Sequence, residues 1–494
     1  MNTFVSLLED CEREIRAGRV QGVAKRLSSL NTARIPREFQ LPLANVCRRV
    51  GLYSLGMKVL ARVVRPSRGA LEMAATSAEL AEYAVLLQRS GAVKEALRTL
   101  EQVDEASVPE AHLYRAYCHF NLWDYETAIP ELERYLARPL SPYAKFVGSV
   151  NLAAALVATE RREEALARLA TDIAYAKEHG YSRLLGNCLE LRAQIHLQRD
   201  DDSAAETDLE AAIRALGGSE TIDQLFVHKW RAVLTSAKSG DVTAIEEFRA
   251  EALRRKDWES VREADLASLG IAFDEGKFRH LVFGTPFAPY RERIRRELGR
   301  WPEEMSFVLG PQDAPCLDVS SGEIDGASRL SAGKKCHQLL EVLLRDFYKP
   351  IRLGGLFAEL FPGEHFDIFS SPDRIHQLIR RTRKWFLEEE LPAAIVEDHG
   401  SYSVEIRGAF AFCVPLERKP VEPHLVQLDK LIGRASSQLS FTAREARAWL
   451  ELSSTSFKRF ASWAIKNGKL ERIGTNNSTI YRLPGLKGLG RSAA

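Results

Sequence analysis

The sequence predicts a mainly α protein: an α-helical solenoid followed by two small α+β domains. Three observations predict this class. Residues 1–280 read as helix after helix, short β-type runs begin at Ser306, and two later segments each end in a basic helix and a hairpin. At 494 residues the chain is too long for one ordinary domain.

The composition is that of a globular protein, with 45% hydrophobic and 28% charged residues. The net charge is only +2, so nucleic-acid binding would require locally concentrated cations. Seven scattered cysteines without a CxxC pair argue against a disulfide framework or a zinc site, and favour reduced thiols. The acidic first turns and the short apolar runs argue against a signal peptide or a membrane span. We expect a soluble, cytoplasmic protein.

The first half repeats a pair of small residues twelve positions apart, which would let two antiparallel helices approach closely. The pairs are Ala44 and Gly56, Ala84 and Ala96, Ala116 and Ala128, Ala153 and Ala165, Ala193 and Ala205, and Ala232 and Ala244. A large apolar residue follows each pair by four positions: Leu60, Leu100, Leu132, Leu169, Leu209 and Phe248. This pattern predicts stacked helical hairpins over residues 1–280, with an unrelated helical bundle as the alternative.

The repeat resembles the tetratricopeptide repeat (TPR), whose small positions have this spacing, although most units here are longer than that family's 34 residues or so. The resemblance implies a TPR-like groove that takes a protein or peptide partner. The basic stretch "YRERIRRELGR" that follows is interpreted as a linker helix within 281–305, with its arginines on a solvated face.

Residues 306–408 read as a small antiparallel sheet, three helices and a hairpin. The first helix, "GKKCHQLLEVLLRDF", has a core face of leucines and Val342. The second is "RLGGLFAELFP", the third begins at Ser371-Pro372-Asp373, and "AAIVEDHGSYSVEI" is a hairpin. On "LLEVLLRDF", "RIHQLIRRTRKWF" and "GSY", this segment resembles the winged helix-turn-helix effector domain of OmpR/PhoB response regulators. A linker is expected over 409–422.

The third helix of this segment would be the recognition helix. At 100° per residue Ile375, Leu378, Ile379, Thr382 and Phe386 share an inward face. The outward residues are candidates for DNA contact: His376, Gln377, Arg380, Arg381, Arg383 and Lys384. Arg380 and Arg383 are the first candidates for groove contact. The alternative is a solvated basic helix, since residues 333–408 hold 11 Lys and Arg against 12 Asp and Glu and the wing is acidic.

Residues 423–484 read as a second module of the same kind. "FTAREARAWLEL" begins with a capping box of Thr442 and Glu445, and "SSTSFKRFASWAIKNGKL" follows after a tight turn. These residues resemble a bacterial winged helix-turn-helix with the pattern T-x-R-E-A-A and a following S-x-x-T-[VF]-x-R. The match runs through Thr442, Arg444, Glu445, Ala446, Leu450, Ser453, Phe457, Arg459, Gly468 and Leu470, and Arg447 stands at the second Ala position. A flexible tail is expected over 485–494.

The recognition helix of the second module has Phe457, Phe460, Ala461, Ala464 and Ile465 facing inward. Its candidates for DNA contact are Thr455, Ser456, Lys458, Arg459, Ser462 and Lys466, together with Asn476 and Asn477 at the hairpin tip. Residues 436–484 hold 8 Lys and Arg against 3 Asp and Glu, a surplus suited to phosphate contact. The alternative is that this fold docks proteins.

The sequence contains no phosphate loop, no HExxH, no GxSxG and no Cys/His cluster, so we expect no enzyme activity, cofactor or metal. The hypothesis is a bacterial-type, DNA-binding transcription regulator in which the TPR-like part controls two winged helices. Its expected partners are double-stranded DNA, a protein or peptide in the groove and, in a possible homodimer, a second copy. The alternative function is a non-enzymatic scaffold for protein–protein interaction.

Overall fold

The computed structural model describes residues 2–16, 19–65, 74–217, 221–417, 423–435, 440–450, 452–474 and 479–484. The chain divides into two compact units. The first combines Met1–Phe307 with Val342–Gly408, and the second combines Val308–Glu341 with Ala409–Ala494. The fold is mainly α, with small sheets confined to the C-terminal part.

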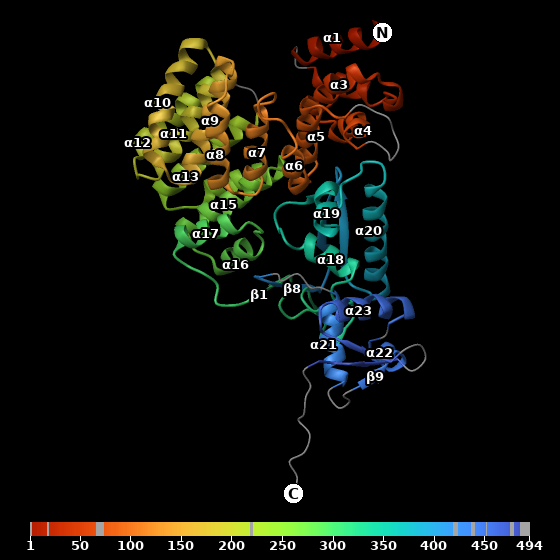
Figure 1. Ribbon diagram of the computed structural model, residues 1–494. Coiled ribbons are helices and arrows are strands. Elements are labelled where there is room, and N and C mark those ends of the chain that lie inside the picture. Colours follow the sequence, from red (N-terminus) through yellow and green to blue (C-terminus); the bar gives the residue numbers. More distant parts are fainter. Residues whose placement is uncertain are drawn as a thin grey trace. The chain divides into compact units, whose positions relative to one another are not determined.

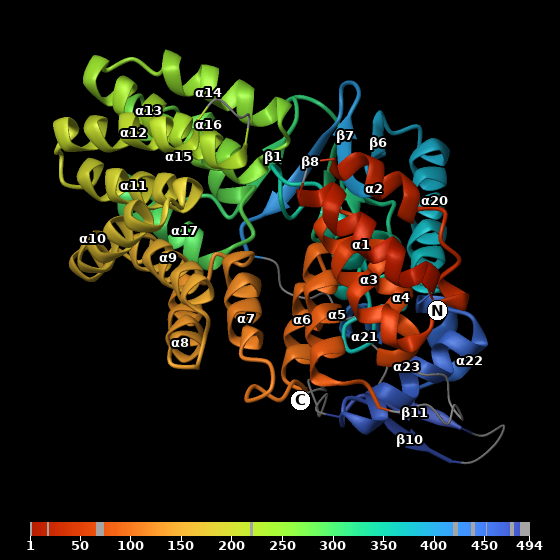
Figure 2. The same cartoon turned by 90° about the horizontal axis from the view of Figure 1, so that it is seen from above.

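The first unit begins with a long series of helices that pack as consecutive antiparallel pairs (Figures 1 and 2). Their bounds are α1 Asn2–Arg16, α2 Val20–Leu27, α3 Arg37–Arg49, α4 Tyr53–Val64, α5 Ser77–Arg89, α6 Val93–Leu100, α7 Glu110–Phe120, α8 Tyr125–Leu136, α9 Pro142–Ala158, α10 Arg162–His179, α11 Ser182–Leu197, α12 Asp202–Leu216, α13 Ile222–Ser239, α14 Thr243–Arg254, α15 Trp258–Ile271, α16 Glu275–Phe283 and α17 Ala288–Leu298, with a 3-10 turn η1 at Thr32–Arg34. We call this series the helical stack.

The predicted pairs of small residues lie where the helices of a hairpin meet. In the first five pairs every member is buried, from Ala44 and Gly56 in α3/α4 to Ala193 and Ala205 in α11/α12. Gly56 shows how tight the approach is, because an added Cβ would lie 3.0 Å from the Leu86 side chain and 3.3 Å from the Ala44 carbonyl oxygen. The large residues four positions after each pair are also buried.

The sixth pair departs from this pattern. In the first five hairpins a residue with left-handed backbone, such as Gly51 or Asp200, stands five positions before the second small residue. In α13/α14 the left-handed residue is Gly240, only four positions before Ala244. The buried residue five positions after Gly240 is therefore Ile245, and Ala232 and Ala244 are only half-buried. The sequence spacing continues through this hairpin, but the close approach at these two alanines does not.

The predicted linker region over 281–305 contains helix α17, which packs against α15. Tyr290 and Ile294 of α17 are buried. Arg293 pairs with Glu263 of α15 at 2.8 Å, and Arg291 donates to the Thr285 carbonyl oxygen at 2.6 Å. These two arginines thus hold α17 in place and do not form the solvated face that we expected.

The first unit also contains the third helix and the hairpin of the segment 306–408. The elements are β5 Ile351–Arg352, α19 Leu353–Leu360, α20 Ser371–Glu388, β6 Ala393–Asp398 and β7 Ser401–Ile406. The three strands form an antiparallel sheet in the order β5-β7-β6. The hairpin turns at His399 and Gly400, which both have positive φ, as the motif "DHGS" predicted.

The boundary between the units falls within α18 (Lys335–Leu343). A five-stranded sheet in the order β1-β8-β2-β3-β4 lies in the second unit, except that the boundary with the first unit falls within β1. Its strands are β1 Ser306–Leu309, β2 Cys316–Asp318, β3 Glu323–Ile324, β4 Ala327–Ser328 and β8 Ala411–Pro415. Two expectations are corrected. The strand β8 lies in the segment assigned to a linker over 409–422, and it runs parallel to β2, so the sheet is not purely antiparallel.

The last elements of the second unit are α21 Pro423–Ala435, β9 Ser440–Thr442, α22 Ala443–Leu450, α23 Ser454–Lys466, β10 Glu471–Ile473 and β11 Ile480–Arg482. Their strands pair in the order β10-β11-β9, and the helices enclose a core that includes Leu431, Phe441 and Phe460. The capping box at the start of α22 is confirmed: Thr442 N donates to Glu445 Oε2 at 2.7 Å, and Glu445 N donates to Thr442 Oγ1 at 3.2 Å.

The looser packing of the sixth hairpin can be tested by replacing Ala232 with a larger residue and comparing it with the same replacement at Ala193. We expect Ala193→Leu to lower the free energy of unfolding by about 1–3 kcal/mol, because the fully buried site between α11 and α12 has no room for the added carbons. Ala232→Leu, at the half-buried equivalent in α13, should cost clearly less. Urea denaturation of both variants measures the difference, and equal reductions in stability would contradict the packing described for the sixth hairpin.

Candidate nucleic-acid interface

Helix α20 separates its residues as the sequence predicts. Ile375, Leu378, Ile379, Thr382 and Phe386 are all buried. The six candidates for DNA contact on this helix are all exposed: His376, Gln377, Arg380, Arg381, Arg383 and Lys384. The helix therefore has an apolar back, which packs against α19 and β6, and a polar face open to solvent.

The exposed candidates on α20 differ in how they are held. Arg383 Nε donates to the Ile395 carbonyl oxygen of β6 at 3.0 Å, so Arg383 lies toward the hairpin and is less suited to groove contact than we expected. His376 Nε2 lies 3.1 Å from the Tyr402 hydroxyl, and Lys384 pairs with Glu388 at 3.1 Å. Gln377, Arg380 and Arg381 make no side-chain hydrogen bond or ion pair with any residue that the structure describes.

The tip of the hairpin is tied to the helical stack. Asp398 Oδ2 lies 2.5 Å from Lys256 Nζ, and this hydrogen bond lowers the pKa of Asp398. Lys256 has a left-handed backbone in the turn between α14 and α15. An acidic tip that is paired with a lysine of the same chain is not a cationic probe for a DNA minor groove.

Helix α19 meets the stack through glycines. An added Cβ at Gly354 would lie 2.7 Å from the Ser90 carbonyl oxygen, and one at Gly355 would lie 3.2 Å from the Gly91 carbonyl oxygen. Gly91 has φ +89° in the turn between α5 and α6. The glycines of "RLGG" thus let the start of α19 rest directly on this turn, beside α6.

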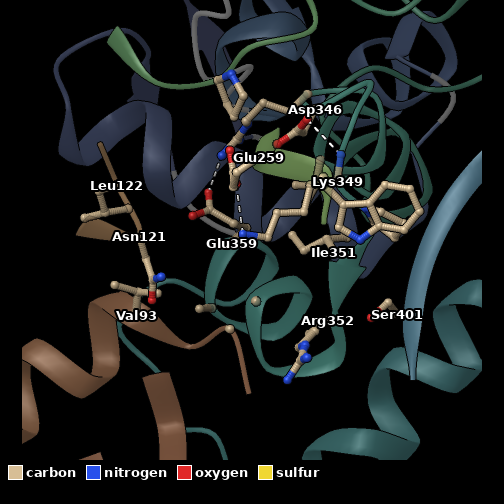
Figure 3. Close-up of a pocket in the computed structure, with 18 of the residues that line it drawn as sticks. Val93, Asn121, Leu122, Glu259, Asp346, Lys349, Ile351, Arg352, Glu359 and Ser401 are labelled. Carbon is tan, nitrogen blue, oxygen red and sulfur yellow. Dashed lines mark hydrogen bonds and ion pairs between the residues drawn. The ribbon is translucent and has the colours of Figure 1, made fainter. Parts of the chain in front are cut away.

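A fully buried arginine joins the same segment to α15. Arg262 is 0% exposed, and its Nη2 donates to both carboxylate oxygens of Asp346 at 2.7 and 2.8 Å. Its Nη1 donates to Glu259 at 2.8 Å, and Glu259 also accepts from Lys349 at 3.0 Å (Figure 3). The rings of Phe287, Tyr290 and Tyr348 surround the guanidinium at 5.1 to 5.8 Å.

The two acidic partners of Arg262 respond differently to burial. Burial raises the pKa of Asp346, and the charge of Arg262 offsets this only in part. Burial would also raise the pKa of Glu259, but the charges of Arg262 and Lys349, together with hydrogen bonds from Lys349 and Trp123, outweigh it, and that pKa is lowered. Glu259 therefore keeps its charge more readily than Asp346, because Lys349 is a second cation beside it.

Two backbone contacts complete the attachment. Phe347 N donates to the Gly284 carbonyl oxygen at 3.1 Å, and a Cβ added to Gly284 would lie 2.5 Å from the Phe347 ring. Farther along, Phe366 N donates to Glu95 of α6 at 2.8 Å. Segment 342–408, which carries α20, is therefore packed against the stack, which the sequence did not lead us to expect. The glycines of "RLGG" were the one signal in the sequence that could have indicated it.

Helix α23 has the same division of faces. The candidates Thr455, Ser456, Lys458, Arg459, Ser462 and Lys466 are all exposed. The predicted inward residues Phe457, Phe460, Ala461 and Ala464 are buried, but Ile465 is 38% exposed. Half-buried Trp463 packs against the core. Ile465 lies at the edge of the inward face of α23, so its side chain is partly open to solvent.

The cations of α23 have no ion pair with the described residues: Lys458, Arg459 and Lys466 are open to solvent. Ser456 is partly engaged at the helix start, where its backbone N donates to Ser453 Oγ at 3.2 Å. The candidates Asn476 and Asn477 lie outside the described residues.

No protein-family model matches this chain, and no curated protein matches it either. Among the described helices, none has both the length and the apolar character needed to cross a lipid bilayer. Across the same residues, no cluster of three or more His, Cys, Asp or Glu is arranged to hold a metal ion. The seven cysteines are free thiols.

The buried arginine should control how firmly segment 342–408 is attached. We expect Arg262→Met to lower the free energy of unfolding by about 3–5 kcal/mol, because Asp346 and Glu259 would be left without their buried partner. Asp346→Asn/Arg262→Met should recover part of that stability. Thermal and urea denaturation measure both. A single variant as stable as the parent chain would show that Arg262 does not hold this junction.

Proposed function

We propose that the chain is a DNA-binding transcription regulator in which α20 and α23 are the recognition helices of two winged-helix modules. The observation that carries the proposal is shared by both helices. Each buries an apolar back in its own module and exposes cations that no described residue neutralises: Arg380 and Arg381 on α20, and Lys458, Arg459 and Lys466 on α23.

An α-helix fits the major groove of B-DNA, where arginine can donate two hydrogen bonds to guanine. Arg380 and Arg381 make no hydrogen bond with the described residues, so their guanidinium donors can reach base edges or phosphates. Gln377, one turn earlier on α20, can read adenine in the same way. These three residues replace the pair Arg380 and Arg383 as the first candidates on α20.

The module around α23 is favoured as the stronger reader. It has a local surplus of positive charge, and binding to phosphates releases counterions. Because the hairpin tip after β6 is acidic and paired with Lys256, the first module is proposed to bind through α20 without inserting its wing. The helical stack, against which the segment that carries α20 is packed, supplies the sensor or interaction surface.

The second candidate function is a scaffold that docks proteins. The acidic hairpin tip and the balanced charge of residues 333–408 favour it for the first module. Under this alternative the exposed arginines of α20 contact acidic side chains of a partner, and the chain has no affinity for nucleic acid.

Fluorescence anisotropy of the full chain with labelled duplex DNA, at several salt concentrations, separates the two functions. We expect Lys458→Ala/Arg459→Ala to weaken binding of random duplex and to reduce the salt slope by about 0.9 for each phosphate that the variant no longer binds. Arg380→Ala/Arg381→Ala should have a smaller effect. Removing these side chains should not affect folding, because they have no partner within the described chain.

Arg231→Ala is the matched control, since Arg231 is also exposed on a helix but lies in the stack. The parent chain and this control should bind equally well. Absence of DNA binding by the parent chain at low salt would reject the regulator and leave the scaffold. An equal decrease in affinity in the control and in the α23 variant would mean that DNA binds through the overall charge of the chain and not through α23.

A further inference from the structure

A cleft of about 600 Å³ opens between the helical stack and segment 342–408, within the first unit (Figure 3). Val93, Asn121 and Leu122 line it from the stack. Lys349 and Arg352 line it from the other segment. Its volume is in the range of sites that bind small organic molecules.

More cationic than anionic side chains line the cleft. Six lysines and arginines and four carboxylates line it. Glu359 is paired with Lys94 and Arg345, while Glu259 is paired with Lys349, and Lys256 reaches outward to Asp398. Asp346 is neutralised by Arg262.

Two arginines in the lining lack a carboxylate partner among the described residues. Arg352 donates through Nη1 to the Arg89 carbonyl oxygen at 2.5 Å and lies 5.7 Å from the Tyr53 ring, which fixes its direction. The Arg89 side chain is exposed and has no ion pair with the described residues. On the acidic side of the described lining only Asp257 has no ion pair, so the unpaired side-chain charge is two positive against one negative.

The helix ends around the cleft add to this positive character. The first residues of α6, α15 and α19 line it, and none of the three helices has a side-chain cap on its N-terminal amides. The C-terminal ends of α5, α7 and α18 also reach the cleft, and turn hydrogen bonds satisfy some of their carbonyls, such as those of Leu87, His119 and Val342. The N-terminal amides of α6, α15 and α19, which no side chain caps, can donate to an anion in the cleft.

Apolar side chains, with Trp258, Phe287 and Ile351 among them, line much of the remaining wall, beside the polar Gln88, Asn121 and Ser401. We propose that this cleft binds a small organic anion whose carboxylate, phosphate or sulfonate head pairs with Arg89 and Arg352 and whose apolar body packs against the Trp258 side of the wall. A ligand held there touches both the helical stack and the segment that carries α20. The site is independent of whether α20 binds DNA.

The test uses the full chain and the probe 8-anilinonaphthalene-1-sulfonate, an anionic head on an apolar body. We expect saturable one-site binding, weakened about tenfold or more in Arg89→Gln/Arg352→Gln, because glutamine keeps much of the length but not the charge. Arg231→Gln, outside the cleft, should bind like the parent chain. Displacement by phenyl phosphate but not phenylacetate would identify a phosphate head, and the reverse a carboxylate head.

Equal probe affinity in the parent chain and the double variant would overturn the proposal, as would a similar decrease in Arg231→Gln. Because Arg352 also touches the Arg89 backbone, the single variant Arg89→Gln serves as a second measurement. The Arg89 side chain makes no hydrogen bond or ion pair with the described residues, so weaker binding in this variant at an unchanged melting temperature reports the site itself.

Discussion

The arrangement of the first unit depends on the buried guanidinium of Arg262. An arginine without solvent exposure would be strongly destabilising if it were alone, so Asp346 and Glu259 must be present and correctly placed. Asp346 is distant in the chain from α15, and its segment can satisfy the arginine only when it is docked. The ion pair is thus a requirement for one particular packing as much as a source of stability.

Around that ion pair, backbone contacts set the fit. Gly91, Gly354 and Gly355 allow the start of α19 to rest on a turn of the stack, and Gly284 does the same beneath Phe347. Side chains at these positions would force the surfaces apart, whereas the Lys256 tether could adapt. The segment that carries α20 is therefore attached to the helical stack through close backbone contacts, and a ligand at their border would act on that attachment.

Under the proposed function the two modules have different roles. The first has a recognition helix on a segment that packs against the stack, a hairpin tip paired with Lys256, and balanced charge. The second has a cation-rich recognition helix and an excess of positive charge. A division of labour follows, in which the second module supplies general affinity for the phosphate backbone and the first supplies a contact that depends on the state of the stack. An organic anion bound in the cleft, as proposed above, would then change how the first module is held against the stack.

The sequence alone determined what depends on local spacing. The small pairs up to Ala193 and Ala205, the buried back of α20 and the capping box at Thr442 all follow from which residues share a helix face or a helix end. Long-range packing decided the rest. Three contacts join residues whose spacing in the sequence carries no periodic signal. They are the pairing of Ala411–Pro415 with β2, the ion pair of Asp346 with Arg262, and the hydrogen bond from Arg383 to β6. The sixth hairpin shows the limit most clearly, because one residue in a turn moved Ala232 and Ala244 away from the close contact that their spacing predicted.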